Sequence, residues 1–322
     1  MLFRSRNEVH GIYREWRKVF NEYNPPKFAV AEAYVRAKRR MLYARPDELG
    51  QAFNFDLLVA DYDAKQFKKI ISDNLKLAKS EGSSSTWVLD NHDKVRHATR
   101  YGLPKKFDLR MWLLSDGKTK EVDRELGLQR ARATTLFLLA LPGCTYMYQG
   151  EELGLFEVED LKETDLQDPT WHRNVVKKIR NEKPTGLALI HTEKGRDGCR
   201  VPLPWAPVGN SFGFSKSGKS HLPQPAWFKD HAVAMQNGIR GTTLEMYREA
   251  LALRKALQTD EELRWVPTKS TEVLHFVRPN GWNCIMNFNS KPYKMPKGEI
   301  LVASGALKAG KIPPNTTVWF RA

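Results

Sequence analysis

Cysteine is scarce in this chain, which has three cysteines among its 322 residues, Cys144, Cys199 and Cys284. They are too few and too far apart in the sequence for a disulfide framework or for the closely spaced ligands of a zinc site. The scarcity is typical of a reducing compartment. We therefore expect a cytoplasmic protein, and we predict neither a metal nor a cofactor.

Long hydrophobic runs are absent as well. The longest apolar run, residues 134–141, is broken at Pro142-Gly143 and falls well short of the roughly 20 residues that span a bilayer. The first residues, MLFRSRNEVHG, lack the apolar core of a signal peptide. These features predict that a membrane is not a partner.

Acidic residues are outnumbered, with 37 Asp and Glu against 52 Lys and Arg, so the formal net charge is +15. Such an excess would suit a nucleic acid or an anionic membrane. The basic residues are scattered, however, and none lies in a recognisable nucleic-acid-binding motif. We predict no nucleic-acid partner. The chain is 41% hydrophobic and 11% aromatic, which is enough for a large globular core.

Helical and strand patterns alternate over about the first 150 residues. An amphipathic helix is predicted at 9–20, followed by apolar strands at 28–35, 53–58, 86–89 and 144–148, with helices at about 63–78 and 123–140 between them. Such alternation favours a parallel sheet covered by helices, which is the α/β fold class.

The pattern changes twice in the second half of the chain. Residues 153–241 are rich in Pro, Gly and Trp and predict an elaborated loop region or small subdomain before a last helix that runs to Leu257. After about Trp265, short β-like runs separated by turn residues predict a small antiparallel β domain. We expect two domains, at 1–263 and 264–322.

Polar residues follow one apolar strand directly. The run Thr86 to Leu89 leads into Asn91, His92 and Asp93, which could not continue a buried strand without unpaired polar groups. In a parallel sheet or barrel this position is the carboxyl edge, where active sites are built. A polar turn that only caps the strand is the plainer alternative. A second polar residue, Glu32, stands alone in the apolar segment 28–35 and would be costly there unless it is used or paired.

Four segments in this order carry a resemblance to a known family. They are Phe28 to Val35, Asn91-His92-Asp93, Tyr148 to Glu152 (YQGEE) and Gly195 to Trp205 (GRDGCRVPLPW). With them the chain resembles glycoside hydrolase family 13, in its α-glucosidase and oligo-1,6-glucosidase branch. The resemblance covers nearly the whole chain. It implies the second half of a TIM (β/α)8 barrel, strands five to eight, followed by the C-terminal β domain.

The resemblance also implies roles for single residues. Family members cleave α-glucosidic bonds with retention, by means of two carboxylates. Glu32 matches the general acid/base, and an apolar strand end would favour its neutral form. Asp93 matches the carboxylate that stabilises the transition state. His92 and Asn91 match residues that bind the substrate, an α-glucoside or a small oligosaccharide. A buried ion pair is the structural alternative for Glu32.

Two arginines belong to a loop that helps to close the pocket in this branch. Either Arg196 or Arg200 matches the arginine at the terminal glucose, and the sequence leaves the choice open. Ion pairs with Asp197 and its neighbours are the structural alternative for both.

One departure from the family decides what the chain is expected to do. The family's nucleophile is an aspartate in a Gly-Phe-Arg-x-Asp-type motif on the fourth strand, and no such motif occurs here. Asp90 is expected to point away from the pocket by strand alternation. We therefore expect a fragment that is inactive alone and whose partner is the missing N-terminal half, or a second copy joined through open strand edges. The alternative is a non-catalytic sugar-binding or protein-docking module.

Overall fold

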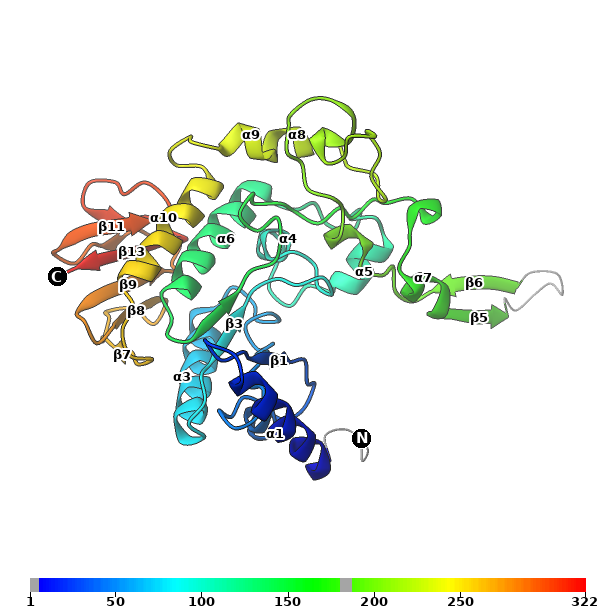
Figure 1. Ribbon diagram of the computed structural model, residues 1–322. Coiled ribbons are helices and arrows are strands. Elements are labelled where there is room, and N and C mark those ends of the chain that lie inside the picture. Colours follow the sequence, from blue (N-terminus) through cyan, green and yellow to red (C-terminus); the bar gives the residue numbers. More distant parts are fainter. Residues whose placement is uncertain (1–5, 180–186) are drawn as a thin grey trace. The chain divides into compact units, whose positions relative to one another are not determined.

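The computed structural model describes residues 6–179 and 187–322, without the side chains of 176–190, and shows a mixture of helices and short strands (Figure 1). The α-helices are α1 (Asn7–Asn21), α2 (Ala37–Tyr43), α3 (Ala64–Ser80), α4 (His97–Gly102), α5 (Leu109–Leu114), α6 (Arg124–Leu139), α7 (Pro169–Arg173), α8 (Phe228–His231), α9 (Val233–Gln236) and α10 (Thr243–Ala256). The strands are β1 (Ala29–Ala31), β2 (Gly50–Ala52), β3 (Thr86–Val88), β4 (Cys144–Tyr146), β5 (Val175–Ile179), β6 (Leu187–His191), β7 (Arg264–Trp265), β8 (Val273–Val277), β9 (Trp282–Asn287), β10 (Tyr293–Lys294), β11 (Glu299–Ala303), β12 (Lys311–Ile312) and β13 (Thr316–Arg321). Short 3-10 helices are η1 (Glu163–Asp165), η2 (Asp197–Cys199) and η3 (Asn210–Gly213).

The chain divides into two compact units. The first unit consists of residues 1–89, 135–146 and 252–322, and the second of residues 90–134 and 147–251. The division expected from the sequence, at residue 263, follows the change of hydrophobic pattern and stays a prediction. Over the described ranges, no helix combines the length and the apolar character that crossing a membrane requires.

Four parallel strands of the first unit lie in two pairs. β1 pairs with β2, and β3 pairs with β4, each in parallel. The hydroxyl of Thr86 links the pairs, because it donates to the carbonyl of Ala52 at 2.6 Å and accepts from the backbone N–H of Asn54 at 3.1 Å. The expected strands near 28–35, 86–89 and 144–148 are present but shorter.

The prediction of a strand at 53–58 is wrong. The strand of this region, β2, ends at Ala52, and the backbone turns after it because the side chain of Asn54 accepts a hydrogen bond from the N–H of Asp56 at 3.0 Å. Residues 36–50 contain α2, a helix that the sequence analysis did not predict. Its Arg40 is buried and donates to Asp56 and to Asn74 of α3, a contact between distant residues that the local pattern does not encode.

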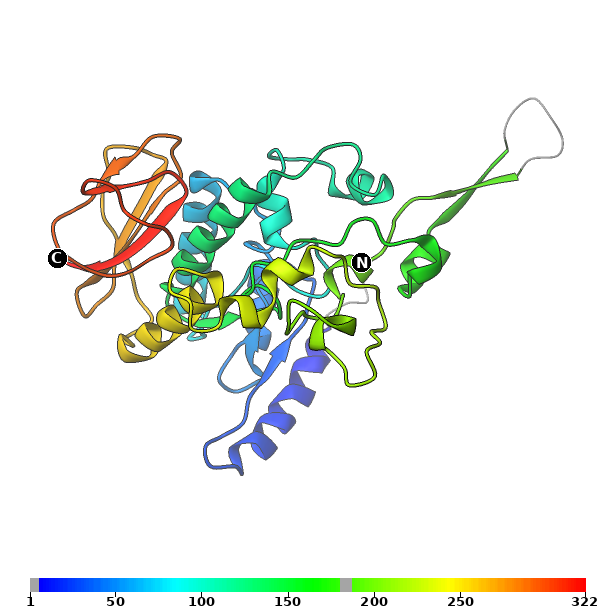
Figure 2. The same cartoon turned by 90° about the horizontal axis from the view of Figure 1, so that it is seen from above.

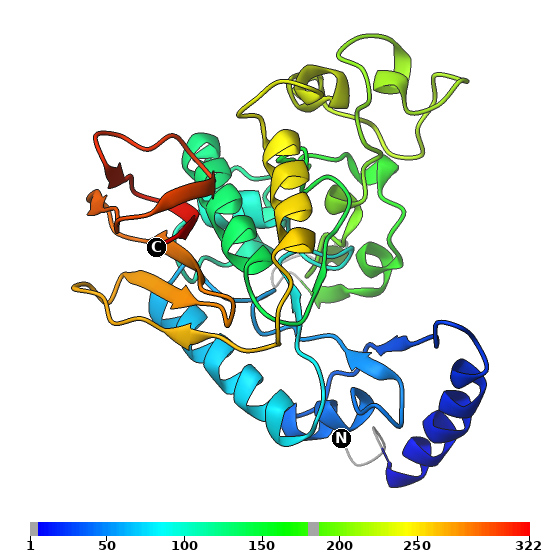
Figure 3. The same cartoon turned by 60° about the vertical axis from the view of Figure 1, so that its left-hand side comes forward.

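The antiparallel sheet expected after about Trp265 is present. Its five strands have the order β11-β13-β9-β8-β7, with every neighbouring pair antiparallel. One core cluster of this sheet contains Val273, Ile285, Ile312, Val318 and Phe320. Helix α3 lies beside the sheet (Figure 3), and its Phe67 meets the ring of Phe288 edge-on. The indole of Trp319 donates to the carbonyl of Leu136 in α6 at 3.0 Å.

The second unit holds the long stretch 153–241, which contains several short elements. β5 and β6 form an antiparallel hairpin after α7 (Figure 2), while residues 180–186 lie outside the described residues. A hydrophobic cluster supports the stretch; its buried members are Leu153, Leu155, Val158, Leu161, Leu166, Val201, Leu222, Phe228 and Leu244. These packed side chains support the stretch that carries Arg196 and Arg200.

Candidate active site

The residues after β3 form a turn in the second unit. The side chain of Asn91 accepts a hydrogen bond from the backbone N–H of Asp93 at 3.0 Å, which closes an Asx turn. The side chain of His92 is exposed over 57% of its surface, whereas that of Asp93 is exposed over 20%. His92 Nε2 lies 3.4 Å from Asp93 Oδ1. The turn thus presents an imidazole and a carboxylate side by side.

Both arginines of the loop 195–205 contact Asp93. Arg196 Nη1 lies 2.7 Å from Asp93 Oδ1, and Arg200 Nη2 lies 3.2 Å from the same oxygen. Arg200 also donates from Nε to the carbonyl of His92 at 2.8 Å. Charge-assisted hydrogen bonds of this kind are short and directional, so the two guanidinium groups fix the carboxylate of Asp93 in place. The structure brings Asn91, His92, Asp93 and both arginines together in one cluster.

Asp168 is a member of this cluster that the sequence analysis missed. Arg196 binds it in a bidentate manner, with Nε 2.5 Å from Oδ2 and Nη2 3.1 Å from Oδ1. Burial by itself would raise the pKa of Asp168, but hydrogen bonds from Arg196 and Thr170 outweigh it and lower the pKa well below its ordinary value. Asp168 also caps α7 through the N–H of Thr170. The signal was available, since Asp168 followed by Pro169 is typical of a helix start.

Arg96 is a second residue that the sequence analysis missed. It is only 2% exposed, and it donates from Nη1 to the carbonyl of Gln149 at 2.9 Å and from Nη2 to the carbonyl of Cys199 at 2.8 Å. Its guanidinium carbon lies 5.1 Å from the ring centroid of Tyr148. Arg96 therefore joins three segments, the turn after β3, the turn after β4 and the arginine loop. Its position three residues after Asp93 gave no physical signal of this role.

Glu157 lies next to Arg96 in the interior of the second unit. Its Oε2 accepts a hydrogen bond from the backbone N–H of Arg96 at 3.0 Å. Burial raises the pKa of Glu157 to about 8, against the smaller lowering effects of Arg96. Glu157 therefore stays neutral over a wider pH range than an exposed glutamate does.

Glu32 lies in the first unit, directly after β1. It is exposed, which corrects the expectation of a buried strand over 28–35. β1 ends at Ala31 and has a hydrogen-bonded neighbour, β2, on one edge only among the residues described, so that the segment beyond it faces solvent. Glu32 lines an open groove together with Tyr13, Trp16 and Tyr34. Within the described ranges it forms no hydrogen bond or ion pair, so the buried pair that was its structural alternative is not found.

Comparison with known proteins places the chain in a family. The sequence model of the alpha amylase catalytic domain matches residues 2–261. The chain belongs to the alpha-amylase family. A probable alpha-glucosidase of Rhizobium meliloti is 30% identical over 304 residues, covering 89% of this chain, and an oligo-1,6-glucosidase of Parageobacillus thermoglucosidasius is 25% identical over 266 residues, covering 77%. The chain spans 47% and 43% of the lengths of these two relatives.

Solved structures of other proteins share the fold. An alpha-glucosyl transfer enzyme matches 98% of this chain and 55% of its own, with a TM-score of 0.71 and 26% identity. The trehalose-6-phosphate hydrolase of Bacillus licheniformis matches 98% of this chain and 59% of its own, with a TM-score of 0.71 and 20% identity. The chain therefore corresponds to rather more than half of each of these enzymes.

Proposed function

We propose that this chain is the acid/base-bearing part of a retaining α-glucosidase, a glycoside hydrolase that releases terminal glucose from small α-glucosides. The observation that carries the proposal is the Asp93 cluster. A carboxylate fixed by two guanidinium groups, Arg196 and Arg200, lies beside the exposed imidazole of His92 in a chain of the alpha-amylase family. This arrangement would bind the hydroxyl groups of one glucose and stabilise positive charge at its ring.

In the proposed reaction Glu32 does the proton transfer. It donates a proton to the leaving glycosidic oxygen, and then removes a proton from the water that hydrolyses the glucosyl-enzyme. Asp93, with His92 and Asn91, holds the sugar during both steps. The nucleophile has to be a second carboxylate, about 5 Å from the first, and the Gly-Phe-Arg-x-Asp motif that would supply it does not occur in these 322 residues.

The proposed architecture is the second half of a TIM barrel over 1–263 with the β domain at 264–322. The proposed partner is a polypeptide that carries the other half-barrel, or a second copy of this chain. The α1 face supports a protein partner, because Ile12, Trp16 and Val19 are about half exposed on one side of that helix. The three free cysteines support a reducing, cytoplasmic location.

The same exposed side chains favour the alternative function, a protein-docking module without catalysis. The apolar face of α1 lies beside β1, which pairs with a strand on one edge only among the described residues. These features would serve docking whether or not a reaction follows. The two functions differ in what they require of Glu32, because docking needs no carboxyl group that exchanges a proton.

A polypeptide of residues 1–322 is expected to show no hydrolysis of an aryl α-glucoside above a buffer blank. The covalent step needs a nucleophilic carboxylate, and the chain lacks the motif that would supply one. The assay measures aryl alcohol release at high protein concentration, with the Rhizobium meliloti relative as the positive control. Turnover that disappears in Glu32→Gln would contradict this prediction, because it would mean that these residues contain a nucleophile of their own.

A further inference from the structure

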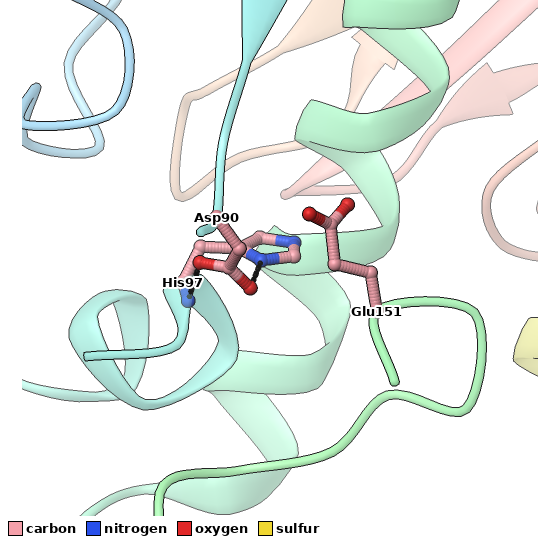
Figure 4. A group of neighbouring side chains, drawn as sticks. All are labelled: Asp90, His97 and Glu151. Carbon is pink, nitrogen blue, oxygen red and sulfur yellow. Dashed lines mark hydrogen bonds and ion pairs between the residues drawn. The ribbon is translucent and has the colours of Figure 1, made fainter. Parts of the chain in front are cut away.

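Three buried titratable side chains lie together behind the Asp93 turn. Asp90 follows β3, His97 is the first residue of α4, and Glu151 lies in the turn after β4. One polar atom of each lies within 4.8 Å of the others, and the imidazole lies between the two carboxyl groups (Figure 4). Burying three such groups is costly unless they serve each other. The roles proposed above for the sugar site use none of them.

Two contacts join Asp90 to His97 and close the backbone loop between them. Oδ1 of Asp90 accepts from the backbone N–H of His97 at 2.6 Å, and Oδ2 lies 2.7 Å from the ring nitrogen Nδ1. Burial alone would raise the pKa of Asp90, but the interaction with His97 and the nearby charges of Arg100 and Arg96 lower it. Because an ionised carboxylate only accepts, Nδ1 has to carry the proton. The turn 91–93 lies within this loop, so the two contacts between Asp90 and His97 hold it.

Glu151 lies on the side of the His97 imidazole opposite to Asp90 (Figure 4). Its Oε1 accepts from the backbone N–H of Tyr148 at 2.9 Å, and its Oε2 from the hydroxyl of Tyr247 in α10 at 3.3 Å. Burial, and after it the charge of Asp90, raises the pKa of Glu151 well above its ordinary value. A neutral carboxylic acid at this place can donate toward the second ring nitrogen of His97, which faces Glu151 in Figure 4.

A metal ion fits this group poorly. Both oxygens of Asp90 already accept from His97, so that Asp90 is an outer partner of the imidazole rather than a ligand. The Arg100 guanidinium lies 3.8 Å from Asp90 Oδ1, and a neighbouring cation opposes the binding of another. The geometry of Asp90, His97 and Glu151 favours three side chains that share a proton. Among the described residues, the other charged and titratable side chains that face the group include those of Arg96, Glu157, Tyr247 and Tyr101, whose ring meets the imidazole edge-on.

We propose that Asp90, His97 and Glu151 form a proton-sharing chain that positions the turn 91–93, with His97 as the positioning residue for sugar binding at Asp93. The chain fixes the turn at one end through Asp90 and connects it to α10 at the other through Glu151. Its effect on sugar binding rests on the proposed function, whereas its protonation and its hold on the turn do not.

The protonation of His97 can be measured without any sugar. The chain contains eight histidines, so 15N-histidine labelling gives a simple spectrum in which His97→Asn identifies the signal of His97. The proposal predicts that Nδ1 of His97 carries a proton at neutral pH, because it lies 2.7 Å from Oδ2 of the Asp90 carboxylate. A His97 that carries its proton on Nε2 alone would overturn the proposal.

Two substitutions of His97 separate positioning from packing. The amide of His97→Asn retains an N–H close to Nδ1, whereas His97→Met fills similar space without a donor. In backbone amide spectra, the signals of 91–93 are expected to shift in His97→Met and to return toward wild type in His97→Asn, even where both variants melt at the same temperature. Equal spectra for the two variants would overturn the proposal.

A titration with glucose tests whether the proton-sharing chain affects sugar binding at Asp93. The dissociation constant is expected to rise about tenfold in His97→Met and much less in His97→Asn, as the loss of one charge-assisted hydrogen bond would cause. If wild type binds no glucose while the proton signal and the amide signals behave as predicted, the proposed function fails and the positioning chain stands. If wild type binds glucose and both variants bind it equally well, the positioning role is wrong.

Discussion

In an assembly that supplies the nucleophile, Glu32→Gln is expected to lower kcat about 1,000-fold for an alkyl α-glucoside, with a much smaller change in KM. The assembly combines this chain with the remaining part of the Rhizobium meliloti relative. The amide cannot protonate the leaving alkoxide, so glycosidic bond cleavage loses its acid, whereas the sugar is still held at Asp93. For an aryl glucoside with an acidic leaving group, cleavage needs little protonation and the loss should be far smaller in that step.

The second half of the reaction gives a separate check on Glu32. Hydrolysis of the glucosyl-enzyme needs a base to activate water, and azide attacks without one. Added azide should therefore restore turnover of the aryl glucoside in Glu32→Gln and leave wild type nearly unchanged. Glu22→Gln is the matched control, because Glu22 is an exposed acid at the end of α1. Equal losses for alkyl and aryl substrates, with no effect of azide, would rule out the acid/base role of Glu32.

Stability is expected to fall as pH rises from 5 to 8, and Glu157→Gln is expected to remove a large part of that fall. The pKa of Glu157 is raised from 4.5 to about 8 in the folded chain. The folded state therefore keeps a proton that the unfolded state loses above pH 4.5. The resulting stabilisation is present in full below pH 4.5 and is lost as pH rises through 8. It amounts to about 4 kcal/mol across this window.

Urea unfolding at pH 5, 6.5 and 8 measures this effect. Glu157→Gln keeps an oxygen that can accept from the N–H of Arg96 but cannot ionise, so its stability should depend less on pH than that of wild type. Glu151 and Glu159 should contribute to the remaining slope, because their pKa values are raised in the same direction. Glu121→Gln, a change at an exposed acid, should reproduce the wild-type slope. If Glu157→Gln has that slope too, Glu157 is ionised in the folded chain.

The parts of the fold that local pattern encodes could be predicted from the sequence. The helix expected at about 63–78 is present as α3, and the carboxylate of Asp63 caps it by accepting from the N–H of Gln66. The β-like runs at 273–277, 283–288, 300–303 and 317–320 appear as strands within one residue of these bounds, because turn residues delimit each of them. The strand at 53–58 failed because Asn54 turns the chain there, and the apolar residues Phe53 and Phe55 pack outside a strand.

The candidate site was predictable only where a motif marks it. Asn91, His92 and Asp93 follow an apolar strand, and the structure places Arg196 and Arg200 on Asp93. Arg96 and Asp168 act through long-range contacts, from Arg96 to Cys199 and from Asp168 to Arg196, and no local spacing encodes such partners. Glu32 was found through the resemblance, and its exposure could not be read from its apolar neighbours.

Recovery of activity in a reconstituted enzyme tests the central claim most directly. This chain and the part of the Rhizobium meliloti relative that carries the Gly-Phe-Arg-x-Asp motif are purified separately, mixed, and assayed for glucose release from a small α-glucoside. The proposal predicts that neither polypeptide is active alone and that the mixture is. The first glucose released should be the α-anomer, as retention requires, and the activity should depend on both Glu32 and Asp93. A soluble, assembled mixture that releases no glucose, or that releases the β-anomer first, would contradict the account.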